Sequence, residues 1–104
     1  MVIVVVNYEY TGDPVEWAKA YTPERAELFV NLPGLKWKIW LDAPGDKRTG
    51  GIYLFEDQVS ADEYANGPLM DRHRKNPALK NLQVRQFNTR DEMSRITRAP
   101  IFFE

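Results

Sequence analysis

Four side chains in this sequence could take part in chemistry beside a bound ligand, as a proton acceptor or as hydrogen-bonding groups. His73 is the single histidine of the 104 residues, and its pKa range suits it to accept a proton near neutral pH. Tyr53 and Tyr8 lie in apolar segments, from which a phenol hydroxyl can donate a hydrogen bond. Asn7 is a polar residue in an apolar run, and a buried amide needs partners that a ligand could supply. We therefore predict His73, Asn7 and Tyr53 as catalytic residues.

Each of these residues also has a structural explanation that the sequence leaves open. His73 lies in the polar run 71–75, which could be a solvated helix face or a basic rim that attracts an anionic substrate. Asn7 could bond nearby backbone at a strand end, and Tyr53 and Tyr8 could serve only the core. The sequence contains no Ser-His-Asp set, no carboxylate pair at a diagnostic spacing and no phosphate-loop pattern.

Composition narrows the class of protein further. The net charge of −1 argues against nucleic acid or an anionic membrane as a partner. With no cysteine and one histidine, thiolate chemistry and a cysteine- or histidine-rich metal site are excluded, so we predict no metal. The apolar run 2–6 is too short for a signal peptide or a membrane span, so we expect a cytoplasmic protein. The length fits a single domain over residues 1–104.

Hydrophobic periodicity predicts the elements that must position these side chains. Strands are expected at 2–10, 35–42, 51–56 and 82–88. Helices are expected at 14–31 with an interruption at Pro23, at 60–75 with a break at Gly67-Pro68, and after Thr89. The residues expected to cap these helices are Asp13, Thr22, Ser60 and Thr89. The order β-α-β-β-α-β predicts an α+β, ferredoxin-like split βαβ fold with an antiparallel sheet.

Alternation divides the second strand between the two faces of the sheet. Leu35, Trp37, Ile39 and Leu41 share one face, which we predict to floor a ligand cavity under the helices. Lys36, Lys38, Trp40 and Asp42 share the other face, which we predict to meet a partner. Trp37 could instead be a plain core residue. The predicted substrate-binding residues are Trp37, Tyr8, Trp17, Ile39 and Tyr64.

The first strand predicts a homodimer. Val2, Val4 and Val6 alternate with Ile3 and Val5, so this strand is apolar on both faces. Two helices can cover only one face of a four-stranded sheet, and the other face would expose an apolar patch. A second copy of the chain, related by a two-fold axis, would bury that patch.

Several segments resemble one known family. The segment 33–40 (PGLKWKIW), followed by 50–55 (GGIYLF), resembles the signature hairpin of the YdhR-type monooxygenases, and the helix start at Ser60-Ala61 fits the same family. The segment 79–82 and the residues Ser94, Ile96 and Ala99 fit it too, whereas 66–76, with its Gly-Pro break, departs from it. The resemblance implies a dimeric α/β barrel, with a ligand cavity between each sheet and its own helices.

The resemblance also implies a function, with alternatives that the sequence leaves open. The first hypothesis is a cofactor-independent monooxygenase that acts on a small aromatic or polyketide-like substrate, with no cofactor. The second is an isomerase, cyclase or dehydratase on the same barrel, and the third is a non-catalytic dimer that binds a small ligand. A haem-degrading oxygenase is a further variant, in which Asn7 and His73 would both lie near the haem.

Overall fold

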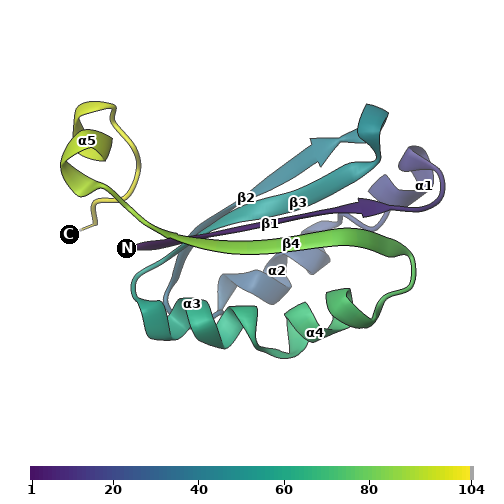
Figure 1. Ribbon diagram of the computed structural model, residues 1–104, viewed down its shortest axis with the longest axis horizontal. Coiled ribbons are helices and arrows are strands. Elements are labelled where there is room, and N and C mark those ends of the chain that lie inside the picture. The colour runs from purple at the N-terminus through teal and green to yellow at the C-terminus, as the bar shows by residue number, and fades with distance from the viewer. Residues whose placement is uncertain (104) are drawn as a thin grey trace.

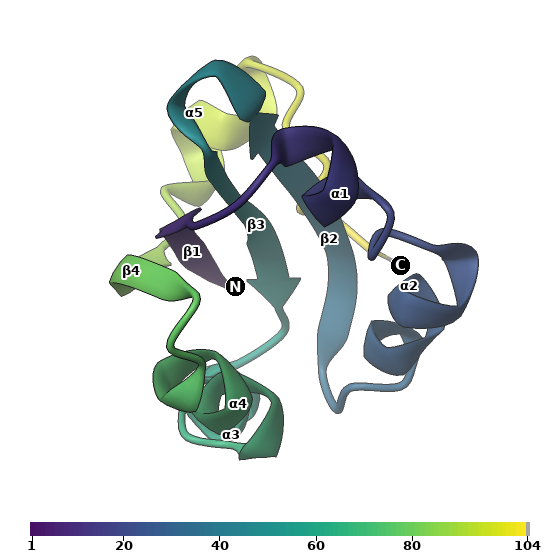
Figure 2. The ribbon, with the colours of Figure 1, turned by 90° about the vertical axis from the view of Figure 1, so that its right-hand side faces the viewer.

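A computed structural model describes residues 1–103 and shows one antiparallel sheet with helices packed on one face (Figure 1). Helices α2, α3 and α4 lie together on that face, which we call the covered face, while α5 lies on the other, the open face (Figures 1 and 2). The strands are β1 (Val2–Tyr10), β2 (Leu35–Ala43), β3 (Arg48–Phe55) and β4 (Leu79–Asn88). The helices are α1 (Pro14–Ala18), α2 (Pro23–Val30), the 3-10 turn η1 (Pro44–Asp46), α3 (Gln58–Ala65), α4 (Pro68–Lys75) and α5 (Asp91–Ile96).

The four strands run in the order β2-β3-β1-β4, with β1 paired antiparallel to both β3 and β4. The apolar strand predicted to be covered on both sides is therefore central, as expected for a strand that is apolar on both faces. The prediction of an α+β, ferredoxin-like fold with an antiparallel sheet is confirmed.

The core lies between the covered face and the helices. Along β1 the side chains alternate between buried and partly buried, which is the period of a strand with one face packed on a core. Phe55 is completely buried beside them, and Phe29 and Met70 close the core from α2 and α4. The buried side chains that β1 contributes are Val2, Val4, Val6, Tyr8 and Tyr10.

The helix starts agree with the predictions in part. Thr22 caps α2 as predicted, since its hydroxyl accepts a hydrogen bond from the Arg25 backbone nitrogen at 3.2 Å. Asp13 precedes α1 but makes no capping bond with its side chain, and Thr89 does not cap α5, whose N-cap position is Arg90. Asp13 is therefore the N-cap residue of α1 as predicted, although its side chain makes no bond there, whereas the prediction that Thr89 caps the last helix is wrong.

The start of α3 also differs from the prediction. The cap is Asp57, whose carboxylate accepts a hydrogen bond from the Ser60 backbone nitrogen at 2.8 Å, and that bond lowers the pKa of Asp57. Ser60 lies one turn inside the helix and is buried against Gly34. Gly34 has φ +76° and no room for a Cβ beside the Ser60 side chain. The hydroxyl that was predicted to cap the helix instead packs against the turn before β2.

A β-bulge in β2 overturns the predicted division of its side chains. Leu35 pairs with Phe55, but the next pairing is Trp37 with Leu54, so Lys36 is an extra residue. One extra residue moves every later side chain to the opposite face. Leu35 points to the covered face as predicted, whereas Trp37, Ile39 and Leu41 point to the open face. Lys38, Trp40 and Asp42 point under the helices, the reverse of the prediction.

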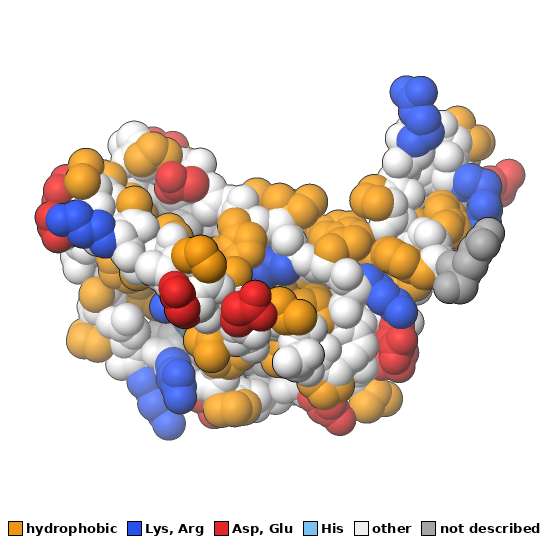
Figure 3. Space-filling view, turned by 180° about the vertical axis from the view of Figure 1, so that it is seen from behind, with side chains coloured by type: hydrophobic (Ala, Val, Ile, Leu, Met, Phe, Trp, Pro, Cys, Tyr) orange, Lys and Arg blue, Asp and Glu red, His pale blue; other side chains and the backbone are white. Residues whose placement is uncertain are grey.

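The C-terminal segment covers one end of the open face. The Trp37 indole nitrogen donates a hydrogen bond to the Pro100 carbonyl oxygen at 2.8 Å, and Leu54, its neighbour on β3, is completely buried. The rest of the open face stays apolar, with Ile39 48% and Phe87 52% exposed. Figure 3 shows hydrophobic side chains along the hollow between α5 and the opposite end of the molecule.

Candidate functional site

A cavity of about 300 Å³ opens between the covered face, α1, α2 and α4. Strand β1 supplies Tyr8, whose ring packs edge-on against the His73 ring at 5.3 Å. Helix α1 supplies Trp17, whose indole stacks on Tyr10 at 4.7 Å. The lining residues are Tyr8, Glu16, Trp17, Ala20, Tyr21, Arg25, Leu28, Phe29, Leu69, Arg72, His73, Asn76 and Leu79.

A narrow recess adjoins this cavity at the sheet. It shares lining residues with the cavity and adds side chains from β2 and β3 beneath α2. The shared residues are Tyr8, Tyr21, Arg25, Phe29 and His73, and the residues found only in the recess are Val6, Lys38, Trp40, Gly50 and Tyr53. The cavity and the recess together form the candidate site.

Lys38 lies in the recess among aromatic rings. Its ammonium nitrogen lies 3.3 Å from the ring centre of Trp40, 3.5 Å from that of Phe29 and 4.7 Å from that of Tyr53. Burial, and secondarily the charge of Arg25, lower the pKa of Lys38 to about 7. Gly51 provides the space, because a Cβ there would lie 2.9 Å from the Lys38 Cε. Lys38 can therefore exchange a proton near neutral pH, while the ring faces favour its charged form.

His73 has one ring nitrogen fixed by the backbone. Its Nδ1 lies 2.9 Å from the Leu69 carbonyl oxygen, one turn earlier in α4. A carbonyl can only accept, so Nδ1 carries the hydrogen and, in the neutral ring, Nε2 is the proton acceptor. Burial is the main cause that lowers the pKa of His73, with smaller contributions from the charges of Arg25 and Lys38. The ring is therefore suited to act as a neutral base beside the cavity.

Arg25 brings a second cation to the cavity and the recess. Its backbone is fixed by the Thr22 cap at the first turn of α2. The Arg25 Nε is buried and has no hydrogen-bond partner among residues 1–103. Arg25, Lys38 and His73 line the same recess, and the charge of Arg25 lowers the pKa values of the other two groups.

A chain of hydrogen bonds fixes the cavity wall beside α1. Thr49 donates to the Leu41 carbonyl oxygen at 2.9 Å, so in the 2.5 Å bond between the Tyr21 and Thr49 hydroxyls Tyr21 is the donor. The Trp17 indole nitrogen in turn donates to the Tyr21 oxygen at 3.1 Å. The chain links α1 to β2 and β3 and holds Trp17 and Tyr21 at the cavity.

Tyr53 and Tyr64 bond to each other beside the recess. The Tyr64 hydroxyl donates to the Tyr53 oxygen at 2.8 Å, and both rings are buried. Burial raises the pKa of both phenols, that of Tyr64 to about 12. Tyr53 lines the recess, whereas Tyr64 lines a separate cavity of about 420 Å³ between α2, α3 and α4. Both phenols are neutral hydrogen-bonding groups at physiological pH.

The structure brings together some of the site residues predicted from the sequence. His73, Tyr8 and Trp17 line the cavity, and Tyr53 lines the recess. Tyr64 packs behind the recess and does not line the main cavity, contrary to its predicted place.

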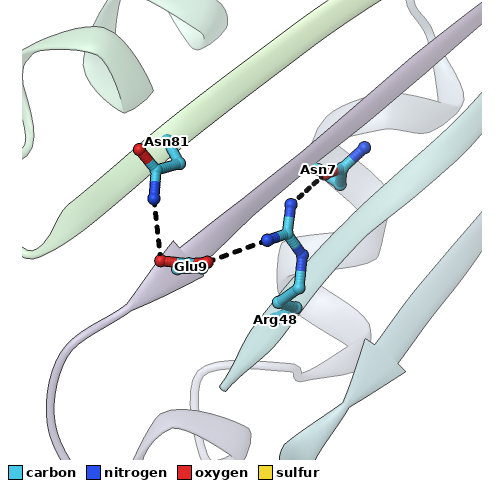
Figure 4. Close-up of polar contacts among 4 residues, drawn as sticks. All are labelled: Asn7, Glu9, Arg48 and Asn81. Carbon is cyan, nitrogen blue, oxygen red and sulfur yellow. Dashed lines mark hydrogen bonds and ion pairs between the residues drawn. The ribbon is translucent and has the colours of Figure 1, made fainter. Parts of the chain in front are cut away.

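The other three predicted residues lie on the open face. Trp37 and Ile39 are placed there by the bulge, so the prediction that they floor the cavity is wrong. Asn7 accepts a hydrogen bond from Arg48 there at 2.7 Å (Figure 4). Asn7 and His73 therefore lie on opposite sides of the sheet and cannot both approach one haem.

Sequence reasoning missed the two cations of the recess. Lys38 was assigned to the partner face because the bulge has no signal in the alternating pattern. Arg25 did carry a signal, since it lies four residues after Tyr21 and four before Phe29, on one side of a helical stripe. A charged residue among the core-facing residues of a helix indicates a possible ligand-binding site.

Residues 1–103 lack two further features, a metal-binding cluster and a membrane-spanning helix. No group of three or more His, Asp or Glu side chains that could hold a metal ion occurs there. None of the helices in this part of the chain has the length and apolar character needed to cross a membrane.

Comparison with known proteins places the chain in a family. Among solved structures, the chain is similar to the heme-degrader MhuD from Mycobacterium tuberculosis with two hemes bound, at 23% identity and a TM-score of 0.64. The match covers 86% of this chain and 96% of the MhuD chain. SnoaB, a cofactor-independent oxygenase from Streptomyces nogalater, has 20% identity and a TM-score of 0.64, covering 86% of this chain and 92% of its own. These likenesses show the fold. No curated protein matches. Residues 3–100 match the family described as "Putative mono-oxygenase ydhR", and the chain belongs to that family.

Proposed function

We propose that the protein is a cofactor-independent monooxygenase that oxidises a small aromatic substrate in the cavity under the helices. The observation that carries the proposal is a base among aromatic walls, since the Nε2 of His73 is the acceptor beside Tyr8 and Trp17. Family membership and the fold shared with SnoaB, which is described as a cofactor-independent oxygenase, agree with this chemistry.

In the proposed reaction, an electron-rich phenol supplies all the electrons. His73 takes the phenol proton, and the resulting anion transfers electrons to O2, so that a C–O bond forms to a peroxide. The O–O bond then breaks, one oxygen stays as the new quinone carbonyl and the other leaves as water. One phenol and one O2 give one quinone and one water, so atoms and electrons balance without a cofactor. The protein has to bind the ring, remove the proton and exclude water.

The experiment is turnover of candidate phenols under ¹⁸O2, with label measured by mass spectrometry in product and water. One labelled oxygen is expected in each. His73→Gln should lower kcat by roughly 10²–10⁴-fold, the usual contribution of a general base, while Arg74→Gln on the same helix is the control. Product that forms equally fast without O2 would refute the monooxygenase.

That result would instead favour an isomerase, cyclase or dehydratase. The specific observation for this second candidate is that two groups able to transfer protons, His73 and Lys38, line the same recess. Proton transfer on an aromatic precursor needs no oxygen. Full anaerobic activity that His73→Gln abolishes would support it.

We also propose that the open face forms a homodimer. The face keeps exposed apolar side chains such as Ile39 and Phe87 that no helix covers. Ile39→Asp should shift the mass found by light scattering toward a monomer at micromolar concentration. Val59→Asp is the control, because Val59 is 66% exposed on α3, away from the open face. A wild-type monomer would contradict the proposal.

A further inference from the structure

We propose that the cavity binds its aromatic ligand as an anion, with the negatively charged oxygen seated between Arg25 and Lys38 at the recess. The proposal rests on the proposed function and deepens it, because it names the charge class of the substrate. Such a site would recognise an aromatic carboxylate, or the phenolate that forms when His73 takes the phenol proton.

The charged side chains around the cavity are strongly unbalanced. Arg25 and Arg72 line the cavity together with His73, and Lys38 lines the recess. The only carboxylate among the described lining residues is Glu16, which is exposed and pairs with Lys19 at 2.8 Å. Among residues 1–103, no carboxylate lies within ion-pair distance of Arg25 or Lys38. The recess is therefore positive and lacks an internal counterion.

Arg25 shows that a partner is missing. Its buried Nε has no acceptor among the described residues, and an unsatisfied buried donor on a charged group is costly. Arg48 offers the contrast within the same chain, because Glu9 and Asn7 accept its hydrogen bonds at 2.9 and 2.7 Å. A ligand oxygen at the recess would accept a hydrogen bond from a terminal guanidinium nitrogen of Arg25, as Glu9 and Asn7 do from those of Arg48.

Lys38 lies where the charged end of a ring ligand would arrive. The recess adjoins the cavity, since both are lined by Tyr8, Tyr21, Arg25, Phe29 and His73. The aromatic walls formed by Trp17, Tyr8 and Phe29 provide faces for the ring of the ligand, and the cations lie at its inner end. An aromatic body and one terminal anionic oxygen match these two parts of the site.

The test compares 2-naphthoate with 2-naphthamide by titration calorimetry at pH 7. The two probes have nearly the same shape and differ in charge, and neither is turned over. We expect the acid to bind at least about tenfold more tightly than the amide, which is the size of one charge-assisted hydrogen bond. Equal affinity for both probes, or binding of neither at millimolar concentration, would overturn the proposal.

Variants locate the anion. Arg25→Gln and Lys38→Met should each remove most of the preference for the acid, and Arg25→Lys, which keeps the charge, should retain part of it. Arg74→Gln is the matched control, because Arg74 pairs with Asp71 on α4 and does not line the cavity. Circular dichroism checks that each variant is folded. An equal loss in Arg74→Gln, or none in Arg25→Gln, would overturn the placement of the anion.

Proton uptake gives a second readout. The titratable groups that line the recess together with Lys38 are Arg25, His73, Tyr8, Tyr21 and Tyr53. Since its pKa is about 7, Lys38 is largely neutral at pH 8, and a bound anion would draw a proton onto it. Calorimetry of 2-naphthoate in two buffers of different ionisation enthalpy should show uptake in the wild type and not in Lys38→Met. Uptake that is absent, or unchanged by the substitution, would overturn the role of Lys38.

Failure of this proposal can be distinguished from failure of the proposed function. The probes are inert and the titrations run without O2, so they report binding alone. A preference for the acid, lost in Arg25→Gln, stands even if no substrate takes up labelled oxygen. Labelled product with no preference for the anion would refute this inference and leave the monooxygenase intact.

Discussion

The cations on the two faces of the sheet have different kinds of partner. On the open face, Arg48 is satisfied by Glu9 and Asn7, and Glu9 also accepts a bond from Asn81 at 2.9 Å (Figure 4). On the covered face, Arg25 and Lys38 have aromatic neighbours and no carboxylate partner among residues 1–103. The hydrogen bonds of Arg48 stabilise the fold, whereas Arg25 and Lys38 on the covered face are available to a ligand. Perturbing each face should show whether this distinction holds.

The largest effect is expected from the core under the helices. Phe55→Ala removes a ring that is completely buried on the covered face, and it should lower the free energy of unfolding by about 3–5 kcal/mol. The measurement is urea denaturation. Phe87→Ala on the open face is the matched control, with an expected loss of about 1 kcal/mol because Phe87 is 52% exposed. Similar losses would contradict the contrast between the faces.

The hydrogen-bond chain should respond next. Thr49→Val keeps the shape of a buried side chain but leaves the Tyr21 hydroxyl without its acceptor, at a cost of about 1–3 kcal/mol in the free energy of unfolding. Thr97→Val makes the same change at an exposed helix end and should cost less. If the order of the two losses is reversed, the chain does not stabilise the cavity wall.

Lys38→Met should stabilise the protein, because it removes a buried charge without a carboxylate partner. We expect a gain of about 1 kcal/mol at pH 7, the usual size of a single substitution. The pKa of Lys38 is near 7 in the folded state and 10.5 in the unfolded state, so wild-type stability from this residue rises with pH across that window. The gain should therefore shrink between pH 7 and pH 9 in urea denaturation. A gain that is constant with pH would show that the charge is not its cause.

The smallest effect is expected on the open face. Glu9→Gln removes the carboxylate from a pair whose side chains are 33% and 37% exposed, so it should cost no more than about 1 kcal/mol. The cost should fall further in high salt, which screens exposed charges. A larger loss that does not depend on salt would mean that the ion pair between Arg48 and Glu9 contributes as much to stability as a buried pair, which would contradict the contrast between the faces.

Much of the fold could be predicted because its signals are local. Three of these signals depend only on neighbouring residues, and the structure contains each of them: the apolar run in β1, the Thr22-Pro23 interruption and the hairpin motif. The start of α3 was misplaced because Asp57 and Ser60 can both cap a helix, and only packing against Gly34 decides between them.

The site was less predictable because it depends on which way side chains point. His73 lies in a polar run, and only the docking of α4 turns its ring toward Tyr8. Asn7 and Tyr8 are adjacent in β1 and both looked functional, yet alternation sends one to each face of the sheet. The bulge shifted every assignment in β2 after Leu35, and hydrophobic alternation contains no sign of it.

The bulge at Lys36 also bears on how family members should be aligned. A relative whose strand pairs without the bulge would present its counterpart of Lys38 on the open face and its counterpart of Trp37 beneath the helices, even if every letter of the strand were identical. In a relative that is one residue shorter here, a gap at Lys36 keeps the later side chains on the faces seen in this chain, whereas a gap placed further along would align side chains from opposite faces. Transfer of a residue's role between such chains is sound only where the gap is placed at this position.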